Sequence, residues 1–348
     1  MRNYGFGKNL DNFVIYKIAY YVSEACKNGT ASAKKIFSAL RDFAAFLRSE
    51  YELRDLEKVR RYHMEHYARR LRMELENDEK KTSTTAGYVS ALNSVFIIFK
   101  CEQNVISAKE FGIERGDRYD NENKAASDEV TKAVLDALLR WYGATGDIRY
   151  LALWHSVRLQ RTAGLRFRES TQIKIAMKTF TNNIVCLVRG DGVKNGQPRT
   201  FRVRDISAFI DAQQFVIEHR HIFAKGSLIP SDLSYDAYKG FAYRVMERLN
   251  EEMGFDFGYH AFRHAYAHES YRLKWVDRVR VAVECPVEVQ KFGNSWVEYV
   301  MQETGMLENE VKDMDNAIRL DVSEELGHHR KDITNTYLGG IRERKKSL

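Results

Sequence analysis

Ten residues in the C-terminal half concentrate side chains that could do chemistry: His260–Glu269, HAFRHAYAHE. Three histidines are spaced four residues apart, and Arg263 lies between the first two. A spacing of four places side chains on one face of a helix, so the histidines could hold a metal ion. The pattern also suits the buried edge of an ordinary helix, or one half of an acid–base site. The rest of the chain has to decide between these three interpretations.

Three other stretches contain residue types that act on phosphates. Arg166 and Glu169 lie in RTAGLRFRES, and His328 and Tyr337 lie in ELGHHRKDITNTYLGG. Lys194 lies in a turn between two β-type runs. Alone, each has an ordinary explanation, such as a surface arginine at the start of a helix or a lysine in a turn.

Together these stretches resemble the tyrosine recombinases, the phage-integrase family, and specifically an integrase of a phage or mobile genomic island. That family has an arginine in a TGLR-x-x-E box, a lysine in a β-hairpin, an H-x-x-R box, an LGH box and a tyrosine shortly after it. Here the boxes read TAGLRFRE, VKNGQPR, HAFRH, LGHH and TNTY, in the same order. The motifs cover Val130 to the C-terminus. The N-terminal helices resemble the family's core-binding domain by pattern and position.

The resemblance implies a site-specific DNA recombinase whose tyrosine attacks a phosphodiester and forms a 3′-phosphotyrosine. A phenol has a pKa near ~10, so the tyrosine needs a group that accepts its proton. Paired guanidinium donors suit the negative charge that gathers on the nonbridging oxygens of the transition state. The implied catalytic residues are Arg166, Lys194, His260, Arg263, His328 and Tyr337.

The implied roles differ between these residues. His260 accepts the tyrosine proton or positions the tyrosine, and His328 donates a hydrogen bond to the phosphate. Lys194 protonates the leaving 5′-oxygen. Glu169 is expected to orient Arg166 or a histidine without contacting the phosphate itself.

Such a reaction uses neither metal nor ATP, because the phosphotyrosine retains the energy of the broken bond, and we predict no cofactor and no metal ligand. A metal site at His260, His264 and His268 stays an alternative. Metalloprotease helices carry HExxH, however, and no glutamate occupies that second position here. His264 is expected to be structural, His268 a satisfied or exposed helix residue, and His329 a surface residue.

The composition favours a folded protein. The 348 residues are enough for two domains, with 44% hydrophobic and 30% charged residues. No apolar run approaches the ~18 residues of a membrane span, and no secretion signal is evident. Four cysteines lie far apart without a CxxC pair, which favours reduced thiols over a zinc ribbon. We expect a cytoplasmic protein of a bacterial host, associated with the nucleoid when bound to DNA and not with a membrane.

The net charge of +7 suits a polyanionic partner, and its distribution is uneven. Residues 189–204 carry five basic side chains against one acid, whereas Trp275–Val322 has ten acids and five basic residues, a balance of −5. We expect DNA contacts near the start of the helix KKTSTTAGYVSALNSV, although capping and solvated charge explain that cluster equally well. The predicted DNA-contact residues are Lys80, Lys81, Thr82, Ser83, Thr84, Thr85 and Arg199.

Hydrophobic periodicity predicts four helices in the first hundred residues, the third running from Leu56 to Glu76 after an Asp55 cap. The runs Ile184–Arg189 and Arg199–Arg204 flank a turn with Gly, Asn and Pro and predict a hairpin. The fold class is therefore mainly α with a small β-sheet. The expected domains are an N-terminal four-helix core-binding bundle (1–114), a polar interdomain linker (115–129) and an α+β catalytic domain (130–348).

Arg263 and His328 are 65 positions apart, which is more than is usual in the family. We therefore predict an inserted segment around 275–320, forming a helical subdomain on the outer face that either contacts a neighbouring protomer or is passive. The expected partners are double-stranded DNA attachment or recombination sites, a homotetramer on DNA, and accessory bending or directionality factors. Two alternatives are a type IB topoisomerase that relaxes DNA and a DNA-binding regulator.

Overall fold

The structure is a computed structural model that describes residues 4–26, 30–114, 121–180, 182–193, 198–203, 206–328 and 330–340. The chain divides into two compact units, residues 1–118 and 119–348. In the part of the chain that is described, no helix has both the length and the apolar character needed to cross a membrane.

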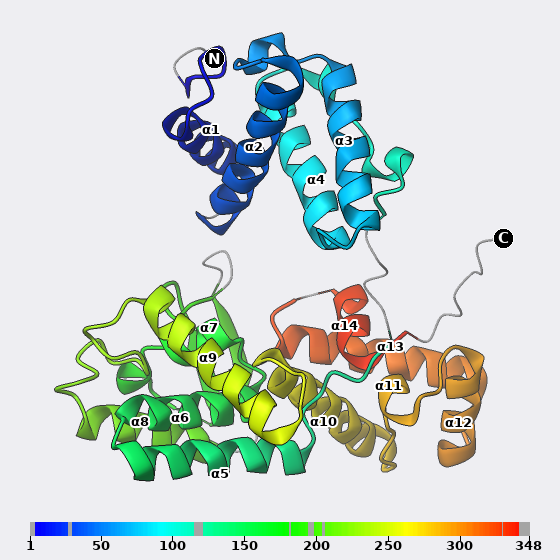
Figure 1. The fold of residues 1–348 in the computed structure, drawn as a ribbon. Coiled ribbons are helices and arrows are strands. Elements are labelled where there is room, and N and C mark those ends of the chain that lie inside the picture. Colours follow the sequence, from blue (N-terminus) through cyan, green and yellow to red (C-terminus); the bar gives the residue numbers. More distant parts are fainter. Residues whose placement is uncertain are drawn as a thin grey trace. The chain divides into compact units, whose positions relative to one another are not determined.

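The N-terminal unit is built on four helices: α1 Asn12–Ala25, α2 Thr30–Tyr51, α3 Arg61–Glu76 and α4 Thr82–Ile98 (Figure 1). The Asp11 carboxylate accepts from the Val14 backbone N–H at 2.8 Å and begins α1. Aromatic rings fill the centre of the bundle, where Phe43 meets the edges of Tyr67 and Phe96. The predicted helical bundle is confirmed.

The predicted third helix is wrong in its first turn. Asp55 caps only a short 3₁₀ turn, η2 Leu56–Lys58, and Val59 is extended, so α3 begins at Arg61. Val59 is buried, which explains the break because its side chain packs into the bundle core. Two further 3₁₀ turns, η3 Glu102–Asn104 and η4 Ala108–Phe111, follow α4.

The C-terminal unit begins with an antiparallel helix pair, α5 Asp128–Thr145 and α6 Ile148–Ala163. Ser127 caps α5 by accepting from the Val130 N–H at 3.2 Å, so Asp128 and Glu129 belong to the helix and not to the predicted linker. The first six linker residues, 115–120, lie outside the described residues.

A second group of elements surrounds that pair. They are α7 Phe167–Gln172, η5 Ile175–Met177, α8 Ser207–Glu218, α9 Tyr235–Met253 and α10 His260–Val279. One apolar core extends from α5 to the start of α10, with Leu153, Phe209 and Phe262 fully buried in it.

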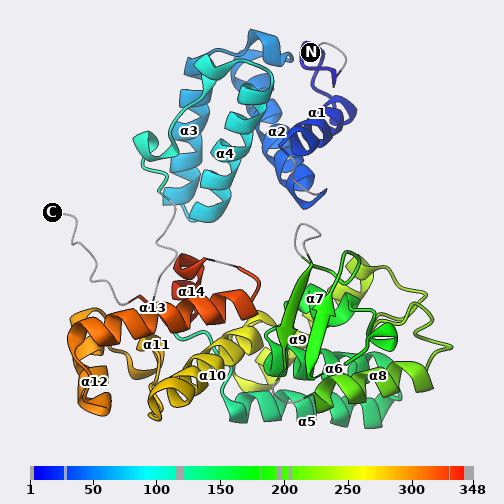
Figure 2. The same cartoon turned by 180° about the vertical axis from the view of Figure 1, so that it is seen from behind.

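The predicted hairpin is present. Strands β1 Ile184–Leu187 and β2 Arg199–Arg202 pair antiparallel, with Ile184 opposite Arg202 and Leu187 opposite Arg199 (Figure 2). Val185 and Leu187 face the core while Ile184 is exposed, the alternation expected of a half-buried strand.

The expected insertion is helical, with α11 Pro286–Val289, α12 Asn294–Thr304 and most of α13 Glu308–Glu325, and α14 Lys331–Leu338 follows. These helices and the second half of α10 share a core of their own, which includes Trp275, Trp296 and Tyr337. The segment is therefore part of the scaffold that holds Tyr337, and not the separate subdomain on an outer face that we expected.

Candidate active site

Arg166 is presented by a sharp turn between α6 and α7. Gly164 ends α6 with a positive φ of 59°, and a Cβ there would come within 2.4 Å of the Tyr266 ring. Arg166 then precedes α7, where its N–H and Nη1 donate to the Glu169 carboxylate at 3.0 and 2.6 Å. Glu169 thus holds the Arg166 guanidinium by a hydrogen-bonded ion pair.

Glu169 is fully buried and also accepts from Arg199 Nη2 at 2.7 Å. Burial would raise the pKa of Glu169, but the charges of Arg199 and Arg166 outweigh it and the pKa lies below its ordinary value. One carboxylate therefore holds two guanidinium groups in place.

Arg199 does not lie on an exposed surface, which contradicts its predicted role in DNA contact. Its side chain is 7% exposed, and Nη1 donates to the Glu325 carbonyl at 2.7 Å. Burial, followed by the nearby charges of Arg263 and Arg166, lowers its pKa to about 10 against the pull of Glu169. Arg199 belongs to the support beneath Arg166.

Arg263 lies at the centre of the site and is fully buried. Its Nη2 donates to the Leu326 carbonyl at 2.7 Å, and Nη1 donates to the Gly164 carbonyl. Its Nε donates to the Tyr337 hydroxyl at 3.1 Å. Burial lowers the pKa of Arg263 from its ordinary value, but the group stays charged at neutral pH because that value is so high. Arg263 therefore joins three of the sequence boxes through its hydrogen bonds.

The Tyr337 hydroxyl lies among the predicted catalytic groups of its own chain. The side chain is 4% exposed, and its oxygen lies 3.3 Å from His260 Nε2 and 3.4 Å from His328 Nε2. Because Arg263 Nε only donates, the tyrosine oxygen accepts that bond, and the O–H is free to point at a histidine nitrogen.

His328 connects the two arginines. Its Nε2 lies 3.1 Å from Arg263 Nη2 and 3.4 Å from Arg166 Nη2. Guanidinium groups only donate, so this nitrogen accepts in the DNA-free site. To donate to a phosphate, as predicted, Nε2 has to carry a proton once the phosphate has replaced these contacts.

His260 and His264 form the other side of the site. His260 as a whole residue is exposed, but the protein atoms around its ring desolvate the charged imidazolium. This desolvation, followed by the charges of Arg263 and Arg166, lowers the pKa of His260 to about 4. His264 is buried, and its ring centre lies 4.6 Å from that of Tyr337. Both imidazoles are neutral near pH 7, so His260 is able to accept a proton.

Sequence reasoning missed the residues that hold α14. Arg319 on α13 pairs with Asp315 at 2.7 Å, and both are buried. The Arg319 guanidinium also donates to Asn335 Oδ1 at 2.9 Å and to the Gly339 carbonyl at 2.8 Å. The available signal was an Asp and an Arg four residues apart on the apolar stripe of a helix.

Two predicted positions lie outside the described residues. They are Lys194 and His329.

The predicted DNA-contact residues at the start of α4 differ in their exposure and in their contacts with other residues. Lys80 Nζ pairs with Glu74 at 2.7 Å and with Asp42 at 3.0 Å. Thr85 is buried and its hydroxyl donates to the Thr82 carbonyl, which argues against contact with DNA. Lys81 and Ser83 are exposed, and Thr82 and Thr84 are partly exposed.

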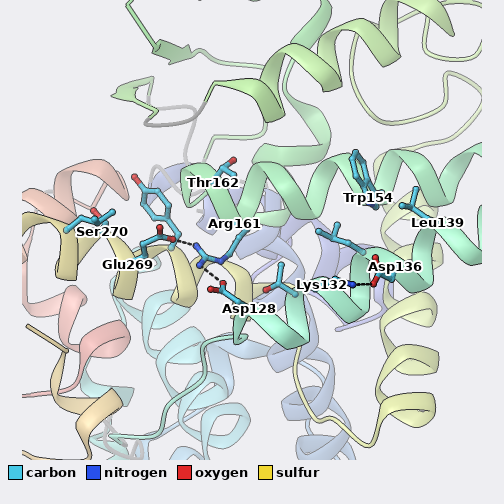
Figure 3. Close-up of a pocket in the computed structure, with 13 residues that line it drawn as sticks. Asp128, Lys132, Asp136, Leu139, Trp154, Arg161, Thr162, Glu269 and Ser270 are labelled. Carbon is cyan, nitrogen blue, oxygen red and sulfur yellow. Dashed lines mark hydrogen bonds and ion pairs between the residues drawn. The ribbon is translucent and has the colours of Figure 1, made fainter. Parts of the chain in front are cut away.

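One pocket of the C-terminal unit is not lined by Tyr337. It has a volume of about 520 Å³ and is lined by residues of α5, α6 and α10. Arg161 bridges Asp128 and Glu269 at its edge, at 2.9 and 2.5 Å (Figure 3). None of the five predicted catalytic residues that the structure describes lines it, so it is not the site of the proposed chemistry.

The helical histidines do not form the metal site considered above. Among the described residues, the group of potential ligands that lie within 4.8 Å of one another is His268, Cys285 and Glu288. His260 and His264 are not part of it.

Comparisons with known proteins bear on the sequence family and the fold. Residues 122–269 match the family model described as Integrase. The fold is similar to that of the XerH site-specific recombinase bound to palindromic difH substrate in a post-cleavage complex (TM-score 0.55, 15% identity, 93% of this chain and 80% of that chain). It is also similar to the Tn1549 transposon integrase in complex with transposon right end DNA (TM-score 0.52, 12% identity, 93% and 94%). No curated protein sequence matches the chain significantly.

The family model covers less than half of the chain, and the structural likeness, at these low identities, shows the fold alone. The chain is thus similar in sequence to the Integrase family over residues 122–269, and similar in fold to these two recombinase structures.

Proposed function

We propose that the chain is a site-specific DNA recombinase that cuts and rejoins DNA through a 3′-phosphotyrosine on Tyr337. The observation that carries this proposal is the position of the Tyr337 hydroxyl, 3.1 Å from Arg263 Nε and 3.3 Å from His260 Nε2. The nucleophile, a cation for the phosphate and an acceptor for the proton meet within one chain.

In the cleavage step, the bond between the Tyr337 oxygen and phosphorus forms while the bond between phosphorus and the 5′-oxygen breaks. The phenol proton passes to His260 Nε2, which is neutral because its pKa lies at about 4. Lys194, in the family's lysine position, supplies the proton for the leaving 5′-oxygen. Reversal by another 5′-hydroxyl rejoins the strand, so the chemistry consumes no ATP.

The arginines supply fixed positive charge. Arg166 is 21% exposed and is the one that an incoming phosphate meets first. Arg263 is fully buried and bonded to Tyr337, so DNA binding has to exchange part of that contact for contacts to a nonbridging oxygen. Since Glu169 and two backbone carbonyls already fix both guanidinium groups, little reorganisation remains for the reaction.

The partners follow from the chemistry and from the relatives, whose solved forms include complexes with difH substrate and transposon end DNA. The substrate proposed for this chain is a pair of double-stranded attachment or recombination sites of a phage or mobile genomic island. Strand exchange then needs a homotetramer on DNA, helped by accessory bending or directionality factors. The work takes place in the cytoplasm of a bacterial host, at the nucleoid. The integrase match does not favour a topoisomerase or a regulator.

The test uses Tyr337→Phe with the full-length chain and nicked suicide duplexes taken from the DNA that flanks its gene. The variant is expected to bind these duplexes as the wild type does and to form no covalent adduct, because the attacking oxygen is missing. Tyr243→Phe, at a tyrosine that is 50% exposed, is the control and should form adduct normally. An undiminished adduct in Tyr337→Phe would move the nucleophile elsewhere. Relaxation of supercoils without exchange between two sites would favour the topoisomerase.

A further inference from the structure

A cluster of three potential metal ligands lies behind the nucleophile. His268 comes from α10, and Cys285 and Glu288 come from the start of α11. His268 and Cys285 are 3% and 0% exposed, while Glu288 keeps a 29% exposed side chain. Glu288 reaches His268 Nδ1 at 3.3 Å with one oxygen and Cys285 Sγ at 3.2 Å with the other.

The orientation of His268 is that of a metal ligand. Its Nε2 lies 2.8 Å from the backbone carbonyl of Tyr337, which can only accept, so Nε2 carries the hydrogen. In the neutral ring, Nδ1 then presents a lone pair to the Glu288 carboxylate, an unfavourable contact that a cation between them would relieve. Metal-bound histidines typically donate their other N–H to a carbonyl or carboxylate in this way.

We propose that His268 Nδ1, Cys285 Sγ and Glu288 bind a divalent zinc ion. Bonds of about 2.0–2.3 Å in a tetrahedron separate neighbouring ligand atoms by roughly 3.3–3.8 Å. His268 Nδ1 and Cys285 Sγ lie 3.3 and 3.2 Å from different oxygens of Glu288, and with one ligand atom taken from each residue all three lie within 4.8 Å of one another. A thiolate, an imidazole and a carboxylate form a donor set that zinc accepts. A water would complete the coordination.

The ion has a route to the site. A pocket of about 260 Å³ is lined by His268 and Glu288 and opens between the segment 123–128 and α10. Arg161 and Arg272 also line it and oppose a cation, but Arg161 is paired with Asp128 and Glu269. The negative charges of the acids that line this pocket therefore offset the positive charges of its arginines.

The bound ion would restrain the nucleophile without touching the reacting atoms. It would join α10 to α11 and fix the histidine ring that holds the Tyr337 carbonyl. The same end of α14 already packs against α11, since a Cβ on Gly339 would come within 2.7 Å of Val287. The zinc ion is thus a structural clamp on the helix of Tyr337, separate from the metal-free chemistry proposed above.

The first experiment measures cobalt(II) bound to the untagged, full-length protein after removal of metals with a chelator. We expect about one Co²⁺ per chain, a thiolate-to-cobalt charge-transfer band and a rise in Tm of about 5 °C with Zn²⁺. Cys285→Ser should lose the band and bind zinc at least about 100-fold more weakly. Cys186→Ser, at an exposed free cysteine, is the matched control and should keep both.

The alternative to a zinc ion between His268 Nδ1 and Glu288 is a proton on Nδ1, which would make an ion pair with the Glu288 carboxylate. No thiolate band in the wild type, or an equal band in Cys285→Ser, would overturn the zinc site. Glu288→Gln keeps the shape of the side chain and should weaken zinc binding while the apoprotein stays folded by circular dichroism. These measurements need no DNA, so their failure leaves the recombinase proposal untouched. Failure of the Tyr337→Phe test likewise leaves the metal site untouched.

Discussion

The arginines around Tyr337 and the lysines at the start of α4 were both expected to meet DNA phosphates, and the structure holds them in opposite ways. Arg263 is fully buried and Arg166 is 21% exposed, and both have their donors fixed by a carboxylate or by carbonyls. Lys81 at the start of α4 is exposed. Lys80, beside it, is bound to Glu74 and Asp42.

This difference separates two uses of positive charge. A charge that is fixed before DNA arrives can stabilise a transition state, because no side chain has to be ordered during the reaction. An exposed lysine contributes to DNA affinity, because its contact with a phosphate releases counterions and helps to position the duplex. This contribution does not depend on a fixed side-chain geometry. Changes in the first region should therefore act on the cleavage rate, and changes in the second on affinity and its salt dependence.

The largest expected effect comes from Arg263→Lys. A lysine keeps the charge but cannot donate to Gly164, Leu326 and the reacting centre together. We expect single-turnover adduct formation to fall about 1,000-fold. Stability should fall by about 2–4 kcal/mol, since buried carbonyls lose their donor. Arg248→Lys, at a 54% exposed surface arginine, is the control. Adduct formation within about tenfold of wild type would show that Arg263 is not the fixed charge of the site.

The next effect in size is that of Glu169→Gln. Without the carboxylate, the partly buried Arg166 and the nearly buried Arg199 lie close to Arg263 with no counter-charge, and stability at pH 7 should fall by about 3 kcal/mol. Urea unfolding measures this loss, with Glu247→Gln at an exposed glutamate as control.

The same variant has a pH signature. The folded pKa of Glu169 is lowered, so its contribution to stability is present above the unfolded pKa of about 4.3 and is lost as the pH falls through the folded value. Glu169→Gln should therefore lose less stability below about pH 4.3 than the wild type does. Parallel losses in the two proteins would mean that Glu169 is not the group that titrates.

His260→Gln separates proton transfer from charge. We expect adduct formation to fall about 100-fold at neutral pH while DNA binding is unchanged. In the wild type, neutral His260 acts above its pKa of about 4, so cleavage should decline as the pH falls through that value. The variant should lack this acid limb. His264→Gln is the control, with a far smaller loss, and a deeper loss there would make His264 the acceptor.

The smallest effect is expected at α4. Lys81→Ser should weaken DNA binding a few-fold and reduce the slope of log K against log salt by about one. Lys80→Ser should leave that slope unchanged and cost about 1 kcal/mol of stability, because Lys80 is bound to Glu74 and Asp42. Fluorescence anisotropy of labelled DNA at several salt concentrations measures the two slopes. Equal slopes in the two variants would remove the contrast between paired and exposed lysines.

The likeness to integrases, the mainly helical fold and the hairpin could be predicted from the sequence, because the ordered boxes and the local periodicity indicate them. The pairing of Lys80 could not, because Asp42 lies 38 residues earlier on another helix. Arg199 belongs to a run of basic residues, but only the hairpin register turns it toward Glu169. Val59 breaks the predicted third helix to reach a core assembled from distant segments.

The Arg319 bonds to Asn335 and Gly339 on either side of Tyr337 have a consequence for exchanging segments between recombinases. An eight-residue helix does not persist by itself in water, so α14 takes its position from α13. A graft that moves only the tyrosine-bearing helix into another scaffold would leave its anchor behind. Transplanting the nucleophile therefore means transplanting residues 308–340 as one piece.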